Sequence, residues 1–102
     1  MRRTGFLYDD RFLLHKTGDE HPELPDRLLA AYLGVQEGGL LPHLTVIEAK
    51  RARQDWVEAV HDIKQIMDFE ESCLYGLDMF QHPDNRICRE SFETAMLAVG
   101  GI

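Results

Sequence analysis

Two short polar segments carry most of the side chains in this sequence that could bind a ligand or move a proton. The first is HPELPDR, residues 21–27, which holds a histidine, two carboxylates and an arginine. The second is QHPDNR, residues 81–86, which holds a histidine, an aspartate and an asparagine. Imidazole, carboxylate and amide groups can hold a substrate by hydrogen bonds, and an imidazole can also transfer protons near neutral pH. Each segment is therefore either the wall of a site or the boundary of a neighbouring helix.

The first segment has the features of a helix start. Pro25 suits the first helical turn, where its missing amide hydrogen costs nothing, and Glu23 and Asp26 favour the positive end of the helix dipole. Arg27 fits this interpretation poorly, because a cation in the first turn opposes the dipole unless a carboxylate or a bound anion accompanies it. The second segment, with acidic and amide residues beside a proline, is typical of a turn. From the residues alone, both interpretations stay open.

Residue spacing reveals no complete catalytic or metal-binding set. The five histidines include no pair at the i, i+4 spacing of a helical zinc site, and His21 with Glu23 makes at most half a site. His61, at the start of an apolar-periodic helix, fits a structural or capping role better than that of a base. Neither a Gly-x-Ser-x-Gly elbow nor a phosphate-binding Gly-x-x-x-x-Gly-Lys motif occurs. We therefore expect no catalytic residue and no metal ligand set within this chain.

The composition is typical of one small, acidic, water-soluble domain. The chain has 102 residues, of which 44% are hydrophobic and 28% charged, and its net charge is -7. That charge argues against a nucleic-acid-binding surface, and no apolar run is long enough to cross a membrane or to form a signal sequence. Cys73 and Cys88 have neither the spacing of a disulfide framework nor that of a zinc knuckle. We therefore expect two free thiols and a cytoplasmic protein.

Apolar periodicity predicts the opening of an α/β sheet. A first strand is expected over residues 4–8, followed by a loop over 15–25. A helix begins at Pro25 and ends before Gly38-Gly39, and residues 44–47 resemble a second strand. The other expected elements are a short helix around Trp56, Val57 and Val60, a longer helix marked by Ile63, Ile66 and Met67, a polar loop over 81–86, and a final helix with Phe92, Ala95, Met96 and Val99 on one stripe. Two strands are too few for a self-sufficient parallel sheet.

The last residues are apolar. Residues 97–102, LAVGGI, include no polar cap or tail, which leaves the final helical carbonyls without partners and an apolar surface uncovered. We therefore expect that the last helix is interrupted and that more strands complete the sheet in a whole domain.

Residues 14–28, LHKTGDEHPELPDRL, resemble the first loop of the histone deacetylase family, particularly its class II and bacterial deacetylase-like or acetoin-utilisation-like branch. Further landmarks follow in the same order. They are Gly38-Gly39-Leu40-Leu41 at the end of the first helix, Val60-His61, and residues 82–95, which resemble the second loop and the helix behind it. The resemblance covers essentially the whole chain.

The resemblance implies an α/β fold: the N-terminal part of a three-layer arginase/deacetylase fold, with two short strands and about four helices. Residues 1–102 are then a single incomplete domain. In the family, zinc activates a water molecule that attacks the amide of an acetylated lysine or another acetylated amine. The zinc ligands, the tandem histidines and the oxyanion-stabilising tyrosine lie downstream of the matching region. Zinc is therefore a cofactor of the full-length family, and no cofactor is expected in this chain.

The resemblance also implies roles for individual residues. His21 and Pro22 match the first-loop rim of the acyl-lysine tunnel. Asp84 and Asn85 match the second-loop rim, and Asn85 falls where class II relatives hold the substrate amide with a polar side chain. Arg27 matches an arginine that lines the internal cavity behind the metal, which implies a role in acetate passage. That role would explain its unusual place at a helix start.

Three functions are compatible with this pattern. The leading hypothesis is an N-terminal fragment or truncated relative of a zinc-dependent deacetylase, which supplies substrate-tunnel loops and is inactive alone. The alternative is a non-catalytic interaction module that hides its apolar surface by forming a homo-oligomer. In the third, a partner chain supplies the missing C-terminal catalytic portion. Gln65 and Arg89, where the family usually has tyrosine and proline, leave the substrate preference open.

Overall fold

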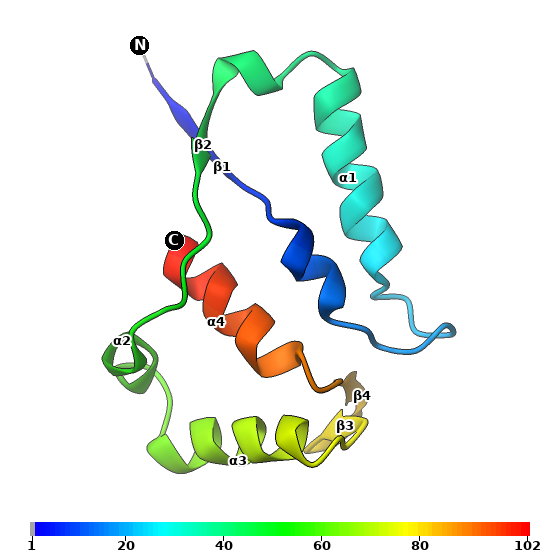
Figure 1. The fold of residues 1–102 in the computed structure, drawn as a ribbon, viewed down its shortest axis with the longest axis vertical. Coiled ribbons are helices and arrows are strands. Elements are labelled where there is room, and N and C mark those ends of the chain that lie inside the picture. The colour runs from blue at the N-terminus through cyan, green and yellow to red at the C-terminus, as the bar shows by residue number, and fades with distance from the viewer. Residues whose placement is uncertain (1) are drawn as a thin grey trace.

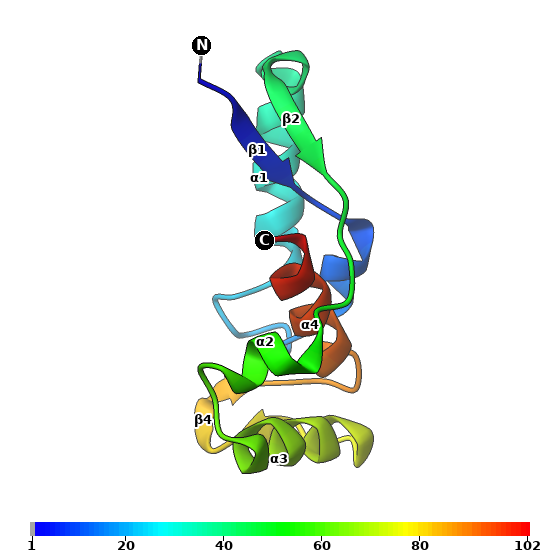
Figure 2. The same cartoon turned by 90° about the vertical axis from the view of Figure 1, so that its left-hand side faces the viewer.

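The computed structural model describes residues 2–102. Its elements are β1 (Thr4–Leu7), η1 (Asp10–Leu14), α1 (Pro25–Glu37), η2 (Leu41–His43), β2 (Leu44–Ile47), α2 (Gln54–Glu58), α3 (Ile63–Leu74), β3 (Met79–Phe80), β4 (His82–Arg86) and α4 (Ser91–Gly101), where η1 and η2 are short 3-10 helices. Figure 1 shows β1, β2 and α1 at one end of the molecule, α2, α3 and the β3–β4 hairpin at the other, and α4 between them. The molecule is flat, with extents of 42 × 34 × 17 Å, and Figure 2 shows it from the side.

β1 and β2 form the parallel pair that the apolar pattern predicts. The register ends with Leu7 opposite Ile47, and the chain between the strands passes through η1, α1 and η2, as a parallel pair requires. β2 has the predicted bounds, whereas β1 ends at Leu7, one residue earlier than predicted. The ring of Tyr8 stacks on Tyr32 of α1 with their centroids 4.1 Å apart. This stacking holds α1 against the end of β1.

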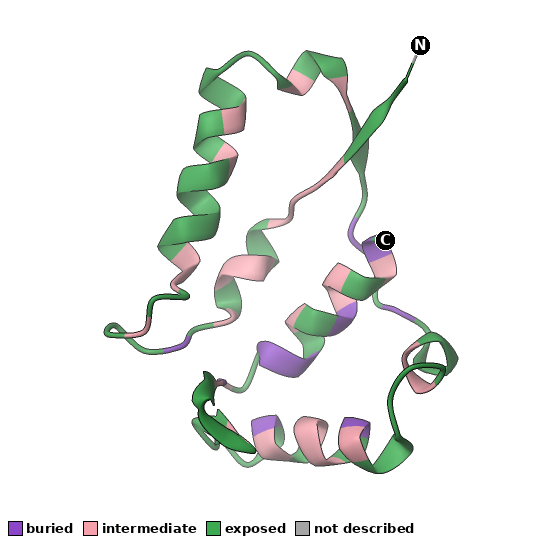
Figure 3. Ribbon diagram, turned by 180° about the vertical axis from the view of Figure 1, so that it is seen from behind, coloured by how far each residue is buried: buried purple, intermediate pink, exposed green. Residues whose placement is uncertain are grey.

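The core lies between α4, α3 and the segment that follows β2. Phe92 and Met96 of α4 are 5% and 3% exposed, and Phe92 meets Phe69 of α3 edge-on. Ala95 and Val99, predicted on the same stripe, are exposed beside a cavity. Figure 3 shows the buried residues concentrated on α4 and α3. The buried cluster consists of Ala52, Ile66, Cys73, Ile87, Phe92 and Met96.

Gly100 allows α4 to touch the segment after β2. A Cβ atom at this position would lie 1.7 Å from the carbonyl oxygen of Lys50 and 2.7 Å from the amide nitrogen of Ala52. The same contact contains a hydrogen bond of 2.9 Å from the Ala52 amide to the carbonyl oxygen of Met96. Backbone therefore meets backbone at this point, and only glycine leaves enough room.

Residues 81–86, predicted as a polar loop, instead contain β4, which pairs with β3 in an antiparallel hairpin. Gln81 has a positive φ of 65°, a conformation that tight turns between antiparallel strands use. Pro83 has no amide hydrogen to donate, which an edge strand tolerates. The polar composition thus concealed a strand that is formed by backbone pairing. The parallel pair and the four α-helices match the prediction, except that α2 ends at Glu58 and leaves Val60 outside it. β3 and β4 add to the predicted elements.

A helical turn that the sequence did not predict precedes the first loop. η1 begins after Asp9, whose carboxylate accepts a hydrogen bond of 2.8 Å from the backbone amide of Arg11, as a helix N-cap does. The Arg11 guanidinium donates to the same carboxylate and lowers the pKa of Asp9 to about 2. The first loop therefore starts from a capped, fixed turn.

Large apolar side chains remain exposed on α1, β2 and the end of α4. Leu33 is 41% exposed, Val46 68% and Ile102 99%. A parallel pair of strands is normally covered on both faces. These exposed apolar side chains are suited to contact with further polypeptide. Within residues 2–102, none of the helices has the length and apolar character needed to cross a membrane.

Candidate functional site

The structure brings together the two segments that the sequence singled out. The Nε2 atom of His21 lies 3.0 Å from the carbonyl oxygen of Asp84 and 3.2 Å from its carboxylate Oδ1. The other ring nitrogen, Nδ1, accepts a hydrogen bond of 3.0 Å from the backbone amide of Glu23. An acceptor at Nδ1 requires that a neutral ring carries its hydrogen on Nε2. His21 therefore donates to Asp84 as the neutral Nε2–H tautomer.

Pro22 and Asn85, which the resemblance assigns to the two rims, are exposed. Pro22 lines an open cleft of about 370 Å³ with Thr17, Asp19 and Arg86. The Nδ2 group of Asn85 donates to the carbonyl oxygen of Phe80 at 3.1 Å, which braces the hairpin. Its Oδ1 atom accepts no hydrogen bond from residues 2–102. The amide donor of Asn85 therefore serves the fold, and its acceptor is not used by any described residue.

A second junction, which sequence reasoning missed, fixes the start of the first loop. The Cys88 thiol donates to the carbonyl oxygen of Leu14 at 3.1 Å and accepts from the amide of Lys16 at 3.2 Å. The hydroxyl oxygen of Ser91 lies 2.6 Å from Nδ1 of His15 and accepts from the amide of Cys88 at 2.8 Å. We call these contacts of Cys88 and Ser91 with residues 14–16 the clasp.

A neutral His15 ring fits the geometry of the clasp. Ser91 Oγ accepts from the Cys88 amide, and its hydroxyl hydrogen can donate to Nδ1 of a neutral His15 ring. Burial lowers the pKa of His15, in agreement with a neutral ring, although the nearby Glu23 carboxylate acts in the opposite direction. Ser91 is 3% exposed. It is therefore placed to hold the loop rather than to attack a substrate.

Arg27 lies in a different cleft, at the start of α1. The cleft has a volume of about 320 Å³, and His15 and Glu23 also line it. The Arg27 side chain forms no salt bridge with any other residue that the structure describes. The carboxylate of Glu23 thus shares the cleft with Arg27 but lies beyond salt-bridge distance of it.

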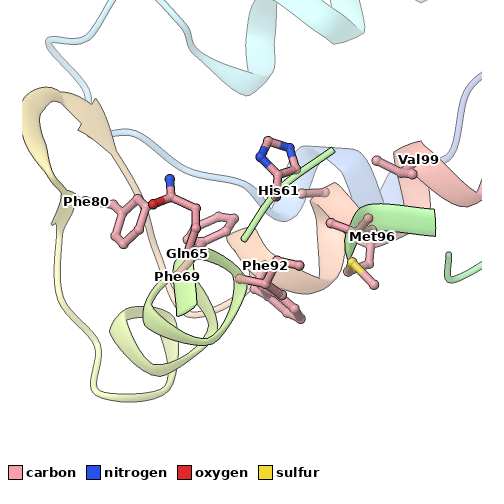
Figure 4. A pocket seen from close by; sticks show the side chains of 10 residues that line it. His61, Gln65, Phe69, Phe80, Phe92, Met96 and Val99 are labelled. Carbon is pink, nitrogen blue, oxygen red and sulfur yellow. The ribbon is translucent and has the colours of Figure 1, made fainter. Parts of the chain in front are cut away.

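An apolar cavity of about 240 Å³ lies between α3 and α4 (Figure 4). Phe69, Phe80 and Phe92 contribute rings to its wall, together with the polar side chains of His61 and Gln65. His61 was predicted to cap a helix or to play a structural role. The N-cap of α3 is its neighbour Asp62, and the His61 side chain instead faces the cavity. This cavity is separate from the contact between the two rim segments.

The residues present do not fit the zinc ion that the family resemblance implies. Within residues 2–102, no group of three or more histidine, cysteine, aspartate or glutamate side chains is placed to hold a metal ion. A catalytic zinc site needs three such ligands and an open position. No chemical step through zinc is therefore assigned to this part of the chain. Cys73 and Cys88 are both free thiols, as predicted.

Comparison with known proteins links this chain to one family. No family model matches the sequence. Histone deacetylase 5 of Arabidopsis thaliana is 31% identical over 62 residues, which are 59% of this chain and 9% of that protein. The crystal structure of the HDA15 HD domain matches 97% of this chain with a TM-score of 0.86 and 26% identity, and the match covers 29% of the HDA15 chain.

The match to the HD domain extends over nearly the whole of this chain. The chain spans less than a third of that domain chain and about a tenth of the curated relative. The agreement in backbone and in sequence shows that this chain is related to the histone deacetylase family and has the fold of a part of its domain.

Proposed function

We propose that this chain forms part of the substrate entrance of a deacetylase-like amidohydrolase that acts on acetylated lysine or another acetylated amine. The contact between His21 and Asp84 carries the proposal, because the two segments that resemble the rim loops of the family meet at these residues. The match of 97% of the chain to a part of the HDA15 HD domain supports it.

The polar atoms at the rim suit the binding of a substrate amide. The exposed Asp84 carboxylate and the Oδ1 atom of Asn85 are acceptors for the N–H groups of an acetylated lysine peptide. Amide hydrolysis also needs an activated water and groups that polarise the carbonyl and protonate the leaving amine. We propose that these groups, and the zinc ion, come from polypeptide outside residues 2–102. The chain alone is then inactive.

The exposed apolar surface on α1, β2 and α4 supports the same proposal. In an active assembly this surface packs against the remainder of a deacetylase-like domain, which belongs either to the same polypeptide or to a partner. The proposed location is the cytoplasm. Nucleic acid is not a proposed partner, because the net charge is -7.

The test measures hydrolysis of an acetyl-lysine peptide reporter with added zinc. The chain alone is expected to match a metal-only blank, and activity is expected when a polypeptide that carries the zinc-binding remainder of an HD domain is added. In that mixture the double variant with Asp84→Ala and Asn85→Ala raises KM, whereas the control Asp55→Ala, on α2, leaves KM unchanged. Turnover by the chain alone, or a KM insensitive to both rim substitutions, contradicts the proposal.

A second candidate function follows from the exposed apolar residues themselves. Val46 and Ile102 are among the most exposed, at 68% and 99%, and a second copy of the chain would cover such a surface in a non-catalytic oligomer. Sedimentation over a range of concentrations separates the two functions. A stable, folded oligomer that does not dissociate when the HD-domain remainder is added favours the interaction module.

A further inference from the structure

We propose that Cys88 and Ser91 are positioning residues for the substrate entrance, because the clasp determines where the first loop meets the second. The importance of this entrance rests on the proposed function. The coupling between the clasp and the contact of His21 with Asp84 is a property of this chain alone. It can therefore be tested without a substrate.

The clasp fixes three consecutive residues. The Cys88 thiol bridges the peptide groups on both sides of His15, through the Leu14 carbonyl at 3.1 Å and the Lys16 amide at 3.2 Å. The Ser91 hydroxyl binds the His15 ring at 2.6 Å. Ser91 is 3% exposed, so water does not compete freely for its hydroxyl. The backbone and the ring of His15 are both held, so the first loop has a single orientation at its start.

Hydrogen bonds within the first loop make it a compact unit. The hydroxyl of Thr17, a buried residue, donates to the carbonyl oxygen of Glu23, and the His21 amide donates to the carbonyl oxygen of Gly18 at 3.2 Å. The Glu23 amide in turn donates to the His21 ring at 3.0 Å. A rotation at the clasp therefore carries His21 with it.

Asp84 is linked to the clasp along a short segment. Asp84 lies in β4, and between it and Cys88 the chain passes through Ile87, which is 8% exposed and belongs to the core. The first loop and the segment from Asp84 to Ser91 are thus joined at two points, by the clasp and by the contact of His21 with Asp84. Without the clasp, the His21 contact has to order a longer free loop, which has a larger entropy cost. The contact is then weaker although neither of its own residues has changed.

Hydrogen–deuterium exchange of the 102-residue chain, resolved by peptide, tests this coupling. Ser91→Ala is expected to speed exchange of residues 15–24 by about tenfold or more, while α3 exchanges at the parent rate. Ser91→Thr, which keeps the hydroxyl, is expected to restore slow exchange. The matched control is Ser72→Ala, because the Ser72 hydroxyl donates only to Asp68 within α3, at 2.7 Å.

Nitrogen-15 spectra of the imidazoles measure hydrogen exchange at individual histidine rings. A general loss of stability would not affect the His21 ring selectively. In Ser91→Ala, the Nε2 hydrogen of His21 is expected to exchange with water faster, and Cys88→Ala is expected to have the same effect. Unchanged exchange of residues 15–24, an effect confined to residues 14–16, or an equal increase in α3 overturns the proposal.

Ser91→Ala and Cys88→Ala together distinguish a failure to fold from a failure of the proposed coupling. If Ser91→Ala does not fold, Cys88→Ala is judged by the same criteria, and failure of both to fold overturns the proposal because the clasp is then a general folding element. Failure of the deacetylase proposal leaves the exchange result unaffected. Conversely, an ordered first loop in a folded Ser91→Ala chain overturns only the coupling.

Discussion

His21 donates from Nε2 to Asp84 across 63 positions of sequence, at 3.0 Å to the carbonyl oxygen and 3.2 Å to the carboxylate. The ring of His21 is 13% exposed whereas the Asp84 side chain is 78% exposed. The histidine is thus enclosed by the two loops, and the carboxylate that receives its hydrogen bond faces solvent. This arrangement joins the two loops while the Asp84 side chain stays accessible to solvent.

The first prediction concerns the tautomer of His21. Because Nδ1 accepts from the Glu23 amide at 3.0 Å, a neutral ring has its hydrogen on Nε2. Long-range proton–nitrogen spectra at pH 8 are expected to show the Nε2–H form for His21, and the Asp84→Asn variant, which keeps both acceptor oxygens, is expected to preserve it. A dominant Nδ1–H form in the folded chain would contradict the assigned geometry.

The second prediction concerns pH. Burial lowers the pKa of His15 below its ordinary value of 6.5, so the unfolded chain binds a proton at this residue more readily than the folded chain. The contribution of His15 to the free energy of unfolding is therefore complete above pH 6.5 and is lost as the pH falls below it. Urea unfolding between pH 7.5 and 5.5 is expected to show this loss.

Two variants identify the histidine responsible for this loss. His15→Asn removes the titrating ring and is expected to flatten the pH dependence, whereas His43→Gln, at an exposed position, is expected to retain it. The pH dependence of the two variants must differ, because the prediction depends on burial of the His15 ring. An equal pH dependence in both variants is the contradictory outcome.

The third prediction concerns the two thiols. Cys73 is 1% exposed and burial raises its pKa, whereas Cys88 is only partly buried. Since the thiolate is the reactive form, iodoacetamide is expected to modify Cys88 at least about tenfold faster than Cys73 in the folded chain. Peptide mass spectrometry measures both rates. In urea the rates should become equal, and equal rates without urea would show that Cys73 is not held in the core.

The sequence predicted elements whose limits are encoded locally. Pro25 and Gly38 mark the ends of α1, and β2 begins just after a proline-containing turn, so both were placed to the residue. β4 was missed because Pro83 and its polar neighbours have the composition of a turn. The hydrogen bonds that make β4 a strand belong to its pairing with β3. Composition does not record such pairing.

The residue types singled out both polar segments, but only the family resemblance placed them at one site. His21 and Asp84 were both assigned to the rim by resemblance, and they meet. The clasp was not predicted, because His15 and Ser91 lie 76 positions apart and no local pattern links a histidine in a loop to a serine at a helix start. The helix dipole left open whether Arg27 pairs with a carboxylate or faces a bound anion, and it forms no salt bridge with a described residue.

The fourth prediction compares two glycines in helices. At Gly100, a Cβ atom would lie 1.7 Å from the carbonyl oxygen of Lys50, which is backbone and has little freedom to move. Gly100→Ala is therefore expected to lower the free energy of unfolding by about 3 kcal/mol. At Gly34, in α1, no atom beyond its chain neighbours and the adjacent helical backbone lies within 4 Å of the added Cβ. Gly34→Ala is expected to raise the free energy of unfolding by about 0.5–1 kcal/mol through its helix propensity.

Urea unfolding of both variants measures these changes, and the opposite signs make each variant the control for the other. The two variants differ in sign because α4 contacts the segment after β2. In this contact the Ala52 amide donates to the carbonyl oxygen of Met96 at 2.9 Å. Loss of this contact separates α4, which begins with Ser91, from the parallel strands. Equal stability of Gly100→Ala and the parent chain would mean that α4 does not approach residues 50–52 as closely as described.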